Sequence, residues 1–446
     1  MAFENCYEQY QFSDYFKTDL PLHWNEKRLG FLAIEEKAAF VDGPFGSDLK
    51  SNDYIDDGIP LIQLNNIRDS KHLLQNMKFV SEEKKLQLIR HIAIPGDVVI
   101  AKMADPVARA AIVNEKYSEY VIVADCVKFT PNLKLINVNY LVWAINCDCV
   151  RVNAELVSTG TTRVRINLGE LKKLKIPYPP TAEQRDIANF LDHETAKIDT
   201  LIAKQQGLIN LLKEKRQAVI SHAITKGLNS KAPMRDSSVE WLGEVPAHWE
   251  MLKGAYIGRL FGSESVLDND VMDEGDIPFI KVSTLDVDSF NLGKIEFFLI
   301  SKIGRSIRTN SDYIVFPKRG AAIFTNKVNI VSRSSVIDPN LMGWAIGDRA
   351  RAEFVAHLLK FRGLKDIADV STVPQINNKH IEPMKFPIPP IDEQDEIIEF
   401  LRGQLERFNH LCGKAEEAIE LMTERRTALI SAAVTGKIDV RDWVQA

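Results

Sequence analysis

The sequence predicts an α+β protein built twice, with two globular domains that are each followed by a long helix. Two observations lead to this prediction. One is a long internal repeat, and the other is a region of short β-branched runs that precedes an amphipathic segment in each copy. At 446 residues the chain has the length of two or three domains. Its 45% hydrophobic and 26% charged residues are typical of globular proteins and exclude wholesale disorder.

The internal repeat is an ungapped match at an offset of 210 residues. Residues 176–225 and 386–435 share 19 identities in 50 positions. Each copy opens with Pro-x-Pro-Pro-x-x-Glu-Gln, continues with Phe-Leu and closes with Ile-Ser-x-Ala-x-Thr. Shorter repeated motifs, such as Pro-x-His-Trp and Phe-Gly-Ser, precede each copy in the same order. A match of this length predicts two copies of one structural unit.

Each repeat predicts one long helix. The prolines fix an extended approach and mark the helix start, where Thr181 with Gln184 fits a capping box and Asp392 can cap the second copy. Gly227 and Gly436 stand where helices usually stop. We expect the helices to pair as an antiparallel coiled coil, although two independent amphipathic helices would show the same pattern. The predicted apolar stripes comprise Ile187, Leu191, Ile198, Leu201, Leu208, Leu212 and Val219, and Ile397, Leu401, Phe408, Leu411, Met422 and Leu429.

The predicted organisation has five segments. They are an N-terminal domain (1–178), a first long helix (179–228), a linker (229–248), a C-terminal domain (249–388) and a second long helix with a tail (389–446). The domains combine short strands with short helices, which is the α+β pattern. Strands are expected at 96–102, 109–114, 119–129, 313–316 and 327–332, and helices at 139–147 and 351–361.

Several kinds of chemistry are missing from the sequence. It contains no phosphate-binding Gly-x-x-x-x-Gly-Lys-Ser/Thr loop, no Gly-rich fingerprint between a strand and a helix, and no Asn/Asp-Pro-Pro-Tyr/Phe loop of amino-methyltransferases. His193 and His222 have no partners at metal-ligand spacing, and the five cysteines include no Cys-x-x-Cys pair. No apolar run is long enough to cross a membrane, and the N-terminus is not a signal peptide. We therefore expect a cytoplasmic protein that is not an enzyme by itself.

The charge distribution is more informative than its sum. The net charge is −5, which argues against a nucleic-acid binder, but residues 391–446 carry all of it. Basic clusters lie before the first helix (163–175) and within the second domain (302–333). Such clusters are either solvated basic faces or phosphate-contacting surfaces, and their occurrence in both copies favours nucleic acid modestly.

These landmarks together resemble the specificity subunit of type I restriction–modification enzymes over essentially the full length. The resemblance rests on the Pro-x-Pro-Pro-x-x-Glu-Gln helices, on residues 241–249 (Trp-Leu-Gly-Glu-Val-Pro-Ala-His-Trp), on 43–47 (Gly-Pro-Phe-Gly-Ser) and on 435–439 (Thr-Gly-Lys-Ile-Asp). It implies two target-recognition domains that each read one half of a bipartite, asymmetric DNA site. At 1.5 Å per residue each helix would span roughly 65–70 Å, about two turns of B-DNA.

The resemblance also implies partners and cofactors. The partners are double-stranded DNA, two methyltransferase (M) subunits and, where the system has them, two restriction (R) subunits. No cofactor is expected on this chain itself, whereas S-adenosylmethionine, ATP and Mg are implied for the partner subunits. Two other classes remain open: the recognition half of a single-chain methyltransferase–nuclease, and a coiled-coil scaffold without a DNA role.

Site residues follow from the basic and amide side chains and from the helix motifs. In the first domain the predicted DNA contacts are Ser47, Lys50, Asn65, Asn66, Arg68, Lys102, Arg109, Thr161, Thr162, Arg163 and Arg165. In the second they are Lys281, Arg305, Arg308, Lys318, Arg319, Asn326, Lys327, Arg333 and Gln375. The predicted partner-binding residues are Glu183, Gln184, Phe190, Leu191, Glu393, Gln394, Phe400 and Leu401. No catalytic or metal-binding residue is predicted.

Overall fold

The fold is described from a computed structural model of the full chain, which divides into two compact units. Unit 1 consists of residues 1–206 and 416–446, and unit 2 of residues 207–415. The structure describes residues 6–68, 70–103, 106–160, 164–262, 266, 270–275, 277–299, 312–369 and 373–443. Each unit therefore contains the end of a helix that belongs to the other sequence repeat.

Unit 1 is built around two four-stranded sheets, in the orders β11-β10-β13-β4 and β8-β5-β12-β9. In the second sheet β5 runs parallel to β12, while the pairs of the first sheet are all antiparallel. The strands of these sheets are β4 (Phe40–Asp42), β5 (Ile59–Ile62), β8 (Lys78–Val80), β9 (Ile92–Ala93), β10 (Val98–Ala101), β11 (Ala110–Ile112), β12 (Tyr120–Ile122) and β13 (Cys126–Phe129).

Smaller elements complete unit 1 and lead into its long helix. The two-stranded pairs are β1 (Tyr10–Ser13) with β2 (Thr18–Pro21), β3 (Asn25–Arg28) with β14 (Lys175–Tyr178), and β6 (Ile67–Arg68) with β7 (Lys71–His72). The helices are α1 (Glu82–Gln87), α2 (Val138–Asn146), α3 (Asp148–Leu156), α4 (Leu168–Lys173) and α5 (Thr181–Lys226), of which the last continues into unit 2. Strand β14 delivers the chain to α5.

Unit 2 repeats this plan. Its four-stranded sheets have the orders β18-β25-β22-β23 and β19-β21-β20-β24, and β20 runs parallel to β24. Their strands are β18 (Gly258–Phe261), β19 (Val271–Met272), β20 (Ile277–Ile280), β21 (Phe298–Leu299), β22 (Tyr313–Pro317), β23 (Asn329–Val331), β24 (Val336–Ile337) and β25 (Leu341–Ile346). The remaining elements are β15 (Met234–Asp236), β16 (Glu244–Pro246), β17 (Glu250–Lys253), α6 (Gly254–Ile257), α7 (Ala352–Arg362), α8 (Asn378–Ile381), β26 (Lys385–Ile388) and α9 (Ile391–Val434).

The main core of each unit takes side chains from both long helices. In unit 1, Phe190 and Leu191 near the start of α5 are buried together with Ala433 and Val434 at the end of α9. In unit 2 the roles exchange, because Ile397 and Leu401 of α9 join Ala223 and Ile224 of α5. Burial of these apolar side chains is what anchors both helix ends in each core. The packing explains why the two units cut across the sequence repeats.

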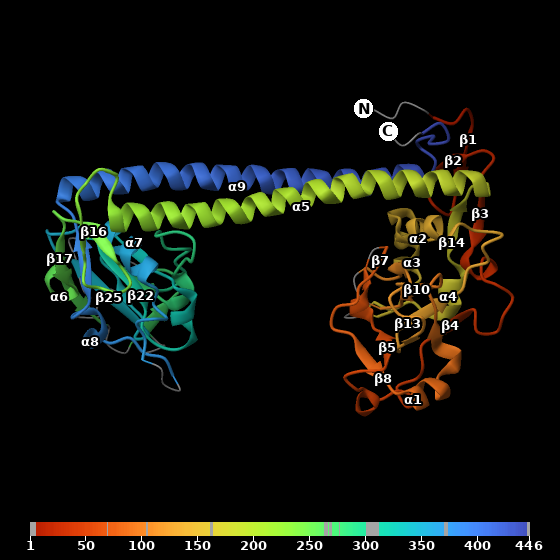
Figure 1. Ribbon diagram of the computed structural model, residues 1–446, viewed down its shortest axis with the longest axis horizontal. Helices are drawn as coiled ribbons and strands as arrows, with labels where there is room; N and C mark the ends of the chain where they lie inside the picture. The colour runs from red at the N-terminus through yellow and green to blue at the C-terminus, as the bar shows by residue number, and fades with distance from the viewer. Residues whose placement is uncertain are drawn as a thin grey trace. The chain divides into compact units, whose positions relative to one another are not determined.

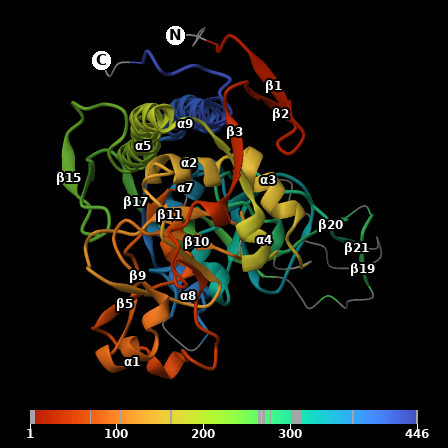
Figure 2. The ribbon, with the colours of Figure 1, turned by 90° about the vertical axis from the view of Figure 1, so that its right-hand side faces the viewer.

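Within each unit the helices run antiparallel, as the apolar spacing predicts. In unit 1 Arg426 of α9 bonds to Asp199 of α5 at 2.8 Å, and in unit 2 Arg216 of α5 donates to Asn409 of α9 at 3.4 Å. Figure 1 shows α5 and α9 side by side along their length, and Figure 2 shows them side by side end on. Both helices end where expected, before glycines with positive φ: 73° at residue 227 and 67° at residue 436.

The predicted stripes are only partly buried. Ile187, Leu191 and Ile198 are buried, but Leu201 and Leu411 keep 50% and 49% of their surface exposed. Leu201 and Leu411 therefore lie at the solvent-exposed part of their stripes. The predicted strands and short helices are confirmed, except that 119–129 forms two strands, β12 and β13, separated by a turn in which Asp125 has a φ of 65°.

Candidate nucleic-acid interface

A carboxylate at the start of α5 organises the polar contacts around it. Glu183 is buried, and its Oε2 accepts hydrogen bonds from the Tyr7 hydroxyl and from the Trp24 indole N–H, both at 2.9 Å. Its Oε1 accepts a third hydrogen bond from His23 Nε2 at 2.7 Å. Burial, and then the charge of Glu183, raises the pKa of the Tyr7 hydroxyl. Three donors compensate the cost of burying this carboxylate.

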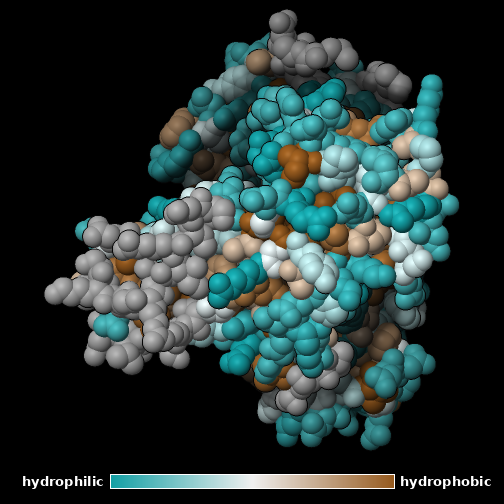
Figure 3. Space-filling model, turned by 90° about the vertical axis from the view of Figure 1, so that its left-hand side faces the viewer, coloured by the Kyte–Doolittle hydropathy of each residue, from teal (hydrophilic) through white to brown (hydrophobic). Residues whose placement is uncertain are grey.

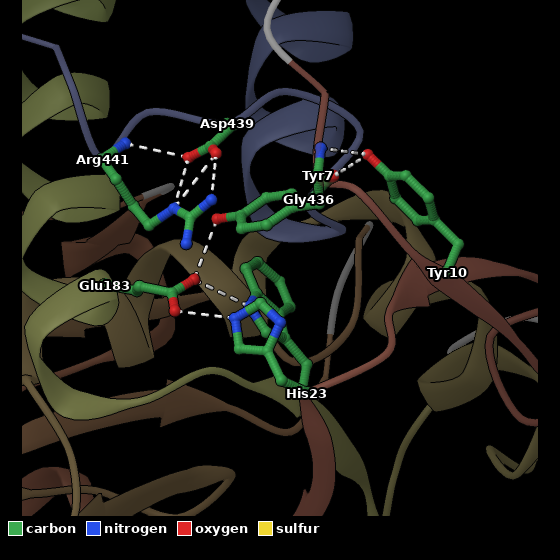
Figure 4. A network of polar contacts seen from close by, with 8 residues as sticks. Tyr7, Tyr10, His23, Glu183, Gly436, Asp439 and Arg441 are labelled. Carbon is green, nitrogen blue, oxygen red and sulfur yellow. Dashed lines mark hydrogen bonds and ion pairs between the residues drawn. The ribbon is translucent and has the colours of Figure 1, made fainter.

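The segment after α9 joins the same network (Figure 4). The Tyr10 hydroxyl donates to the Gly436 carbonyl at 2.9 Å. Arg441 pairs with Asp439 at 2.5 Å, and its guanidinium carbon lies 4.8 Å from the ring centroid of Tyr7. Residues near both ends of the described chain are thereby bonded to one another within unit 1.

The same arrangement occurs in unit 2. Glu393 accepts a hydrogen bond from His248 Nε2 at 2.7 Å and another from the Trp249 indole N–H at 3.0 Å. The recurring Pro-x-His-Trp motif thus binds the recurring Glu of the helix start in both copies. The sequence signal for this contact was present, since both motifs recur in the same order, but the contact itself was not predicted.

The glutamines of the motif fix the approach to each helix. Gln184 Oε1 accepts the Asn137 N–H at 2.8 Å, and Gln394 Oε1 accepts the Arg351 N–H at 2.7 Å. The Nε2 group of each donates to the carbonyl of the proline five residues earlier, at 2.9 and 2.8 Å. Gln184 therefore does not form the expected capping box with Thr181.

These contacts correct most of the predicted partner-binding residues. Glu183 and Gln184 are buried and hydrogen-bonded inside unit 1, as Gln394 is inside unit 2. Phe190, Leu191 and Leu401 are fully buried in the cores, and Glu393 is half-buried against unit 2. Among the predicted partner-binding residues, only Phe400, with 38% of its surface exposed, presents an apolar side chain to solvent.

A polar edge lies at the end of β10 in unit 1. The Lys102 N–H donates to the Asp125 carbonyl at 2.8 Å, and the Ile166 N–H donates to the Lys102 carbonyl at 3.0 Å. The Lys102 side chain is buried, and its Nζ pairs with Asp42 at 2.6 Å. Arg165 pairs with Asp125 at 2.5 Å and keeps about half of its side chain exposed. Burial makes Lys102 a poor DNA contact, which corrects that prediction, whereas Arg165 faces solvent.

Unit 2 builds the equivalent edge at the end of β22. The Lys318 N–H donates to the Asn340 carbonyl at 2.8 Å, and the Ile376 N–H donates to the Lys318 carbonyl at 2.9 Å. Arg319 forms an isolated bridge with Gln375, just as Met103 does with Arg165 in unit 1. We call these two places the strand-end edges: Lys102 and Arg165 in unit 1, and Lys318, Arg319 and Gln375 in unit 2.

The strand-end edge of unit 2 has more available positive charge. Arg319 is exposed, and Lys318 is half-buried. Burial, and then the neighbouring charge of Arg319, lowers the pKa of the Lys318 ammonium. An anion placed beside both side chains would relieve their mutual repulsion. Two cations and the amide of Gln375 on one edge are suited to phosphates and to base edges.

Asn66 is buried, which corrects its predicted role. Its Nδ2 donates to the Leu73 and Gln75 carbonyls, both at 3.0 Å, and its Oδ1 accepts the Gln63 N–H at 3.0 Å. Both of its amide hydrogens are used inside the chain, so the side chain holds a turn and is not free to read a base.

Asn326 has a similar structural role. It adopts a left-handed conformation with a φ of 50°, and its Nδ2 donates to the Lys360 carbonyl at 2.8 Å. Its Oδ1 accepts the Leu364 N–H at 3.1 Å. These contacts tie the segment before β23 to α7, and the DNA contact at the half-buried Asn326 stays a prediction.

The other predicted DNA contacts differ in exposure. Arg109 is buried and lines a cavity together with Arg68 and residues of α5. The Nζ of Lys281 lies 3.8 Å from the ring centroid of Phe297. The exposed residues are Ser47, Lys50, Asn65, Arg68, Arg165, Arg319 and Arg333, and the half-buried ones are Lys281, Lys318, Lys327 and Gln375. Thr161, Thr162, Arg163, Arg305 and Arg308 lie outside the described residues.

The described part of the chain offers neither a metal-binding cluster nor a membrane-spanning helix. No group of three or more His, Cys, Asp or Glu side chains is arranged to hold a metal ion there. None of its helices, the two long ones included, has an apolar stretch that could span a membrane. On the face that Figure 3 shows, hydrophilic residues cover most of the surface and hydrophobic ones form small separate spots.

Comparisons with known proteins agree on one family. The family described as "Type I restriction modification DNA specificity domain" matches residues 47–211 and 248–421. The type I restriction enzyme MjaVIII specificity subunit of Methanocaldococcus jannaschii is 20% identical over 461 residues, which cover 98% of each chain. The EcoKI specificity subunit of Escherichia coli K12 is 21% identical and covers 86% of this chain and 83% of its own.

Solved structures have the same fold. A structure described as "Structural basis underlying complex assembly and conformational transition of the type I R-M system" has a TM-score of 0.68 at 15% identity, covering 93% of this chain and 98% of its own. The HsdS subunit of Thermoanaerobacter tengcongensis has a TM-score of 0.55 at 14% identity, covering 94% and 98%. Since the family match spans most of the sequence in two copies, this chain belongs to the type I restriction–modification DNA specificity family.

Proposed function

We propose that the chain is the specificity subunit of a type I restriction–modification complex and reads a bipartite, asymmetric DNA site through its two domains. The observation that carries this proposal is the strand-end edge, which is built twice on one backbone plan with different side chains. Arg165 in unit 1 is replaced by Gln375 in unit 2, and Met103 by Arg319. Equivalent frames with unlike polar groups suit two unlike half-sites.

The test of DNA recognition targets the edge of unit 2. Reversing both charges, with Lys318→Glu and Arg319→Glu, should weaken DNA binding by the assembled complex and flatten its salt dependence. Lys253→Glu, an exposed lysine of β17, is the matched control and should leave binding unchanged. Fluorescence anisotropy with a labelled duplex measures both effects. Unaltered binding by the double variant would show that this edge is misassigned.

The docking of methyltransferase subunits is proposed on exposed leucines of the long helices. These leucines recur at equivalent positions of the repeat, Leu201 with Leu411 and Leu211 with Leu421, and all four are exposed. Exposed leucines at two pairs of repeat-related positions suit two copies of the same partner. Leu211→Asp with Leu421→Asp should reduce co-purification with the methyltransferase subunit, while Lys215→Gln should not.

Catalysis is assigned to the partners. In this proposal the chain binds no cofactor, the M subunits supply S-adenosylmethionine and adenine methylation, and R subunits, where present, supply ATP- and Mg-dependent cleavage in the cytoplasm. Incubation of the purified chain with labelled S-adenosylmethionine should transfer no methyl group to DNA, and the M subunit should restore transfer. Methylome sequencing of cells that express both chains would then reveal the two half-sites. Methyl transfer by the chain alone would favour the single-chain methyltransferase class.

A further inference from the structure

A large cavity in unit 2 is not used by the proposed function. Its volume is about 1250 Å³, and it lies between α7 and the parts of α5 and α9 that belong to unit 2. Arg216 of α5, Arg402 and Asn409 of α9, and His357 and Lys360 of α7 are among its lining residues. The lining carries five cations and five carboxylates, so the question is which cations are left without a carboxylate partner.

Unit 1 offers an internal reference for this place, because the helices repeat at an offset of 210 residues. Arg426, the equivalent of Arg216, bonds to the Asp199 carboxylate at 2.8 Å, and Lys71 pairs with the same carboxylate at 3.6 Å. The Arg426 guanidinium also lies 5.8 Å from the ring centroid of Trp143, whose Nε1 donates to Asp192 at 2.7 Å. In unit 1 the arginine is neutralised and an indole stands beside it.

Three replacements change this place in unit 2. At the offset of 210, Asp199 becomes Asn409 and Asp192 becomes Arg402. Trp143 becomes His357, because each lies six residues after the backbone N–H that the motif glutamine accepts. Two carboxylates are thus lost, one cation is gained, and a smaller ring replaces the indole.

In unit 2, Arg216 and His357 are left with weak hydrogen bonds or none. Arg216 makes two long contacts of 3.4 Å, to Asn409 Oδ1 and to the Asp288 carbonyl. His357 is only 4% exposed, and its Nε2 has no hydrogen-bond partner among the described residues. Burial, followed by the charges of Lys360 and Arg216, lowers the pKa of His357 to about 3, so the ring is neutral, and it lies in edge contact with Phe290 at 4.5 Å between ring centroids.

Of the five carboxylates of the lining, two pair with other cations, and the charges of Asp288 and the neighbouring Asp286 act on Lys360 without forming an ion pair with it. Glu353 pairs with Arg402 through both of its oxygens, and Asp366 lies 3.6 Å from Arg362. Lys360 donates its Nζ hydrogen to the Val287 carbonyl rather than to a carboxylate. Within the described residues, no ion pair joins an acid to Arg216 or Lys360.

We infer that this cavity binds the phosphate group of a small phosphorylated molecule beside Asn409, the counterpart of the Asp199 carboxylate of unit 1. Arg216 and Lys360 supply the positive charge, and the neutral His357 ring donates its Nε2 hydrogen. A phosphate presents several acceptor oxygens, which matches these donors better than a carboxylate does. The inference goes beyond the proposed DNA recognition and does not depend on it.

Calorimetric titration of the full chain with inorganic phosphate tests the inference. Sodium chloride at matched ionic strength serves as the blank. Wild type should bind phosphate saturably at one site, and Arg216→Gln should weaken binding about tenfold or more, as expected for the loss of a charged hydrogen-bond donor. Lys215→Gln removes the same charge one residue away, outside the cavity lining, and should not change the affinity.

Asn409→Asp is the sharper variant, because it restores the unit 1 carboxylate and leaves Arg216, Lys360 and His357 in place. It should abolish phosphate binding while the helical content remains that of wild type, since residue 409 is exposed. His357→Trp, which restores the unit 1 indole, is an independent second variant with the same expected loss. Absence of saturable binding by wild type, or wild-type affinity in Asn409→Asp, would overturn the inference.

A duplex titration distinguishes a free phosphate ligand from the DNA backbone. If the cavity serves a small molecule, a short duplex should not displace phosphate, and Asn409→Asp should bind the duplex like wild type. Displacement of phosphate by the duplex, with an equal loss of duplex affinity in Asn409→Asp, would overturn the small-molecule ligand and assign the cavity to DNA contact. The test of the strand-end edge with Lys318→Glu and Arg319→Glu does not depend on either result.

Discussion

At the scale of the residue, the two glutamates at the helix starts show how the repeat is held together. Glu183 accepts three hydrogen bonds and Glu393 accepts two, and in both cases a tryptophan indole is among the donors. The Glu183 side chain is the more buried of the pair. A buried carboxylate depends more strongly on its donors because water cannot replace them.

This difference predicts unequal effects of one substitution made at equivalent positions. Trp24→Phe should destabilise unit 1 by about 1–3 kcal/mol, because it leaves a buried Glu183 oxygen without its indole donor. Trp249→Phe should lower the stability of unit 2 by less, since Glu393 is more accessible to water. Native-state hydrogen exchange, read separately in peptides of the two units, measures both losses. Equal losses would contradict the argument from burial.

A pH effect follows from His72. Burial lowers its pKa from 6.5 to about 4, and its Nδ1 accepts the Asn114 N–H at 3.0 Å. Below pH 6.5 the histidine binds a proton in the unfolded chain but stays neutral in the folded chain. The free energy of unfolding of unit 1 should therefore fall by about 2 kcal/mol between pH 7 and pH 5. His72→Gln keeps an acceptor for the Asn114 N–H and should remove the part of the pH dependence of stability that comes from His72. Hydrogen exchange around β7 at both pH values compares the two proteins, and identical pH slopes would refute the assignment.

At the scale of the element, the long helices are anchored at their ends and exposed along parts of their apolar stripes. Leu191 of α5 is fully buried in the unit 1 core, while Leu201 is half exposed. The spacing in the sequence treats both residues alike. Only the packing of the domain and of α9 around Leu191 separates their roles.

The two leucines therefore provide a matched pair of substitutions. Leu191→Ala should destabilise unit 1 by about 2–5 kcal/mol, because it leaves a cavity in a packed core. Leu201→Ala should change stability by no more than about 0.5 kcal/mol, as exposed substitutions usually do. Hydrogen exchange at the start of α5 distinguishes them. A large loss of stability in Leu201→Ala would mean that this residue is part of the helix seam after all.

At the scale of the whole molecule, the helices continue from one unit into the other, and in the proposed function they set the spacer of the DNA site. Inserting four residues into α5 adds about one turn, or roughly 6 Å, and nearly preserves the face of the apolar stripe. The spacer should lengthen while both half-sites stay the same. Four residues inserted after Asn229, outside both helices, should leave the spacer unchanged. Methylome sequencing reads both outcomes, and an unchanged spacer in the α5 variant would refute the ruler.

The structure divides the predicted DNA contacts into exposed and buried side chains, and single residues show the physical reason. Arg165 and Arg319 are exposed on the strand-end edges, but Lys102 and Asn66 are buried by partners distant in the sequence or by a turn. A basic or amide residue in a loop has the same local signature in either case. Whether its side chain meets solvent depends on which strands pack over it.

The sequence by itself determined the repeat, the α+β class, the two long helices and their ends, because prolines, glycines and apolar periodicity act over a few residues. Only the tertiary structure decided that each core takes helix ends from both copies, and that the motif glutamates bind the Pro-x-His-Trp segments. It also decided that Arg216 faces Asn409 where Arg426 faces Asp199. Those outcomes depend on which side chains meet after the chain has folded, since burial and hydrogen-bond partners join residues that are far apart in sequence.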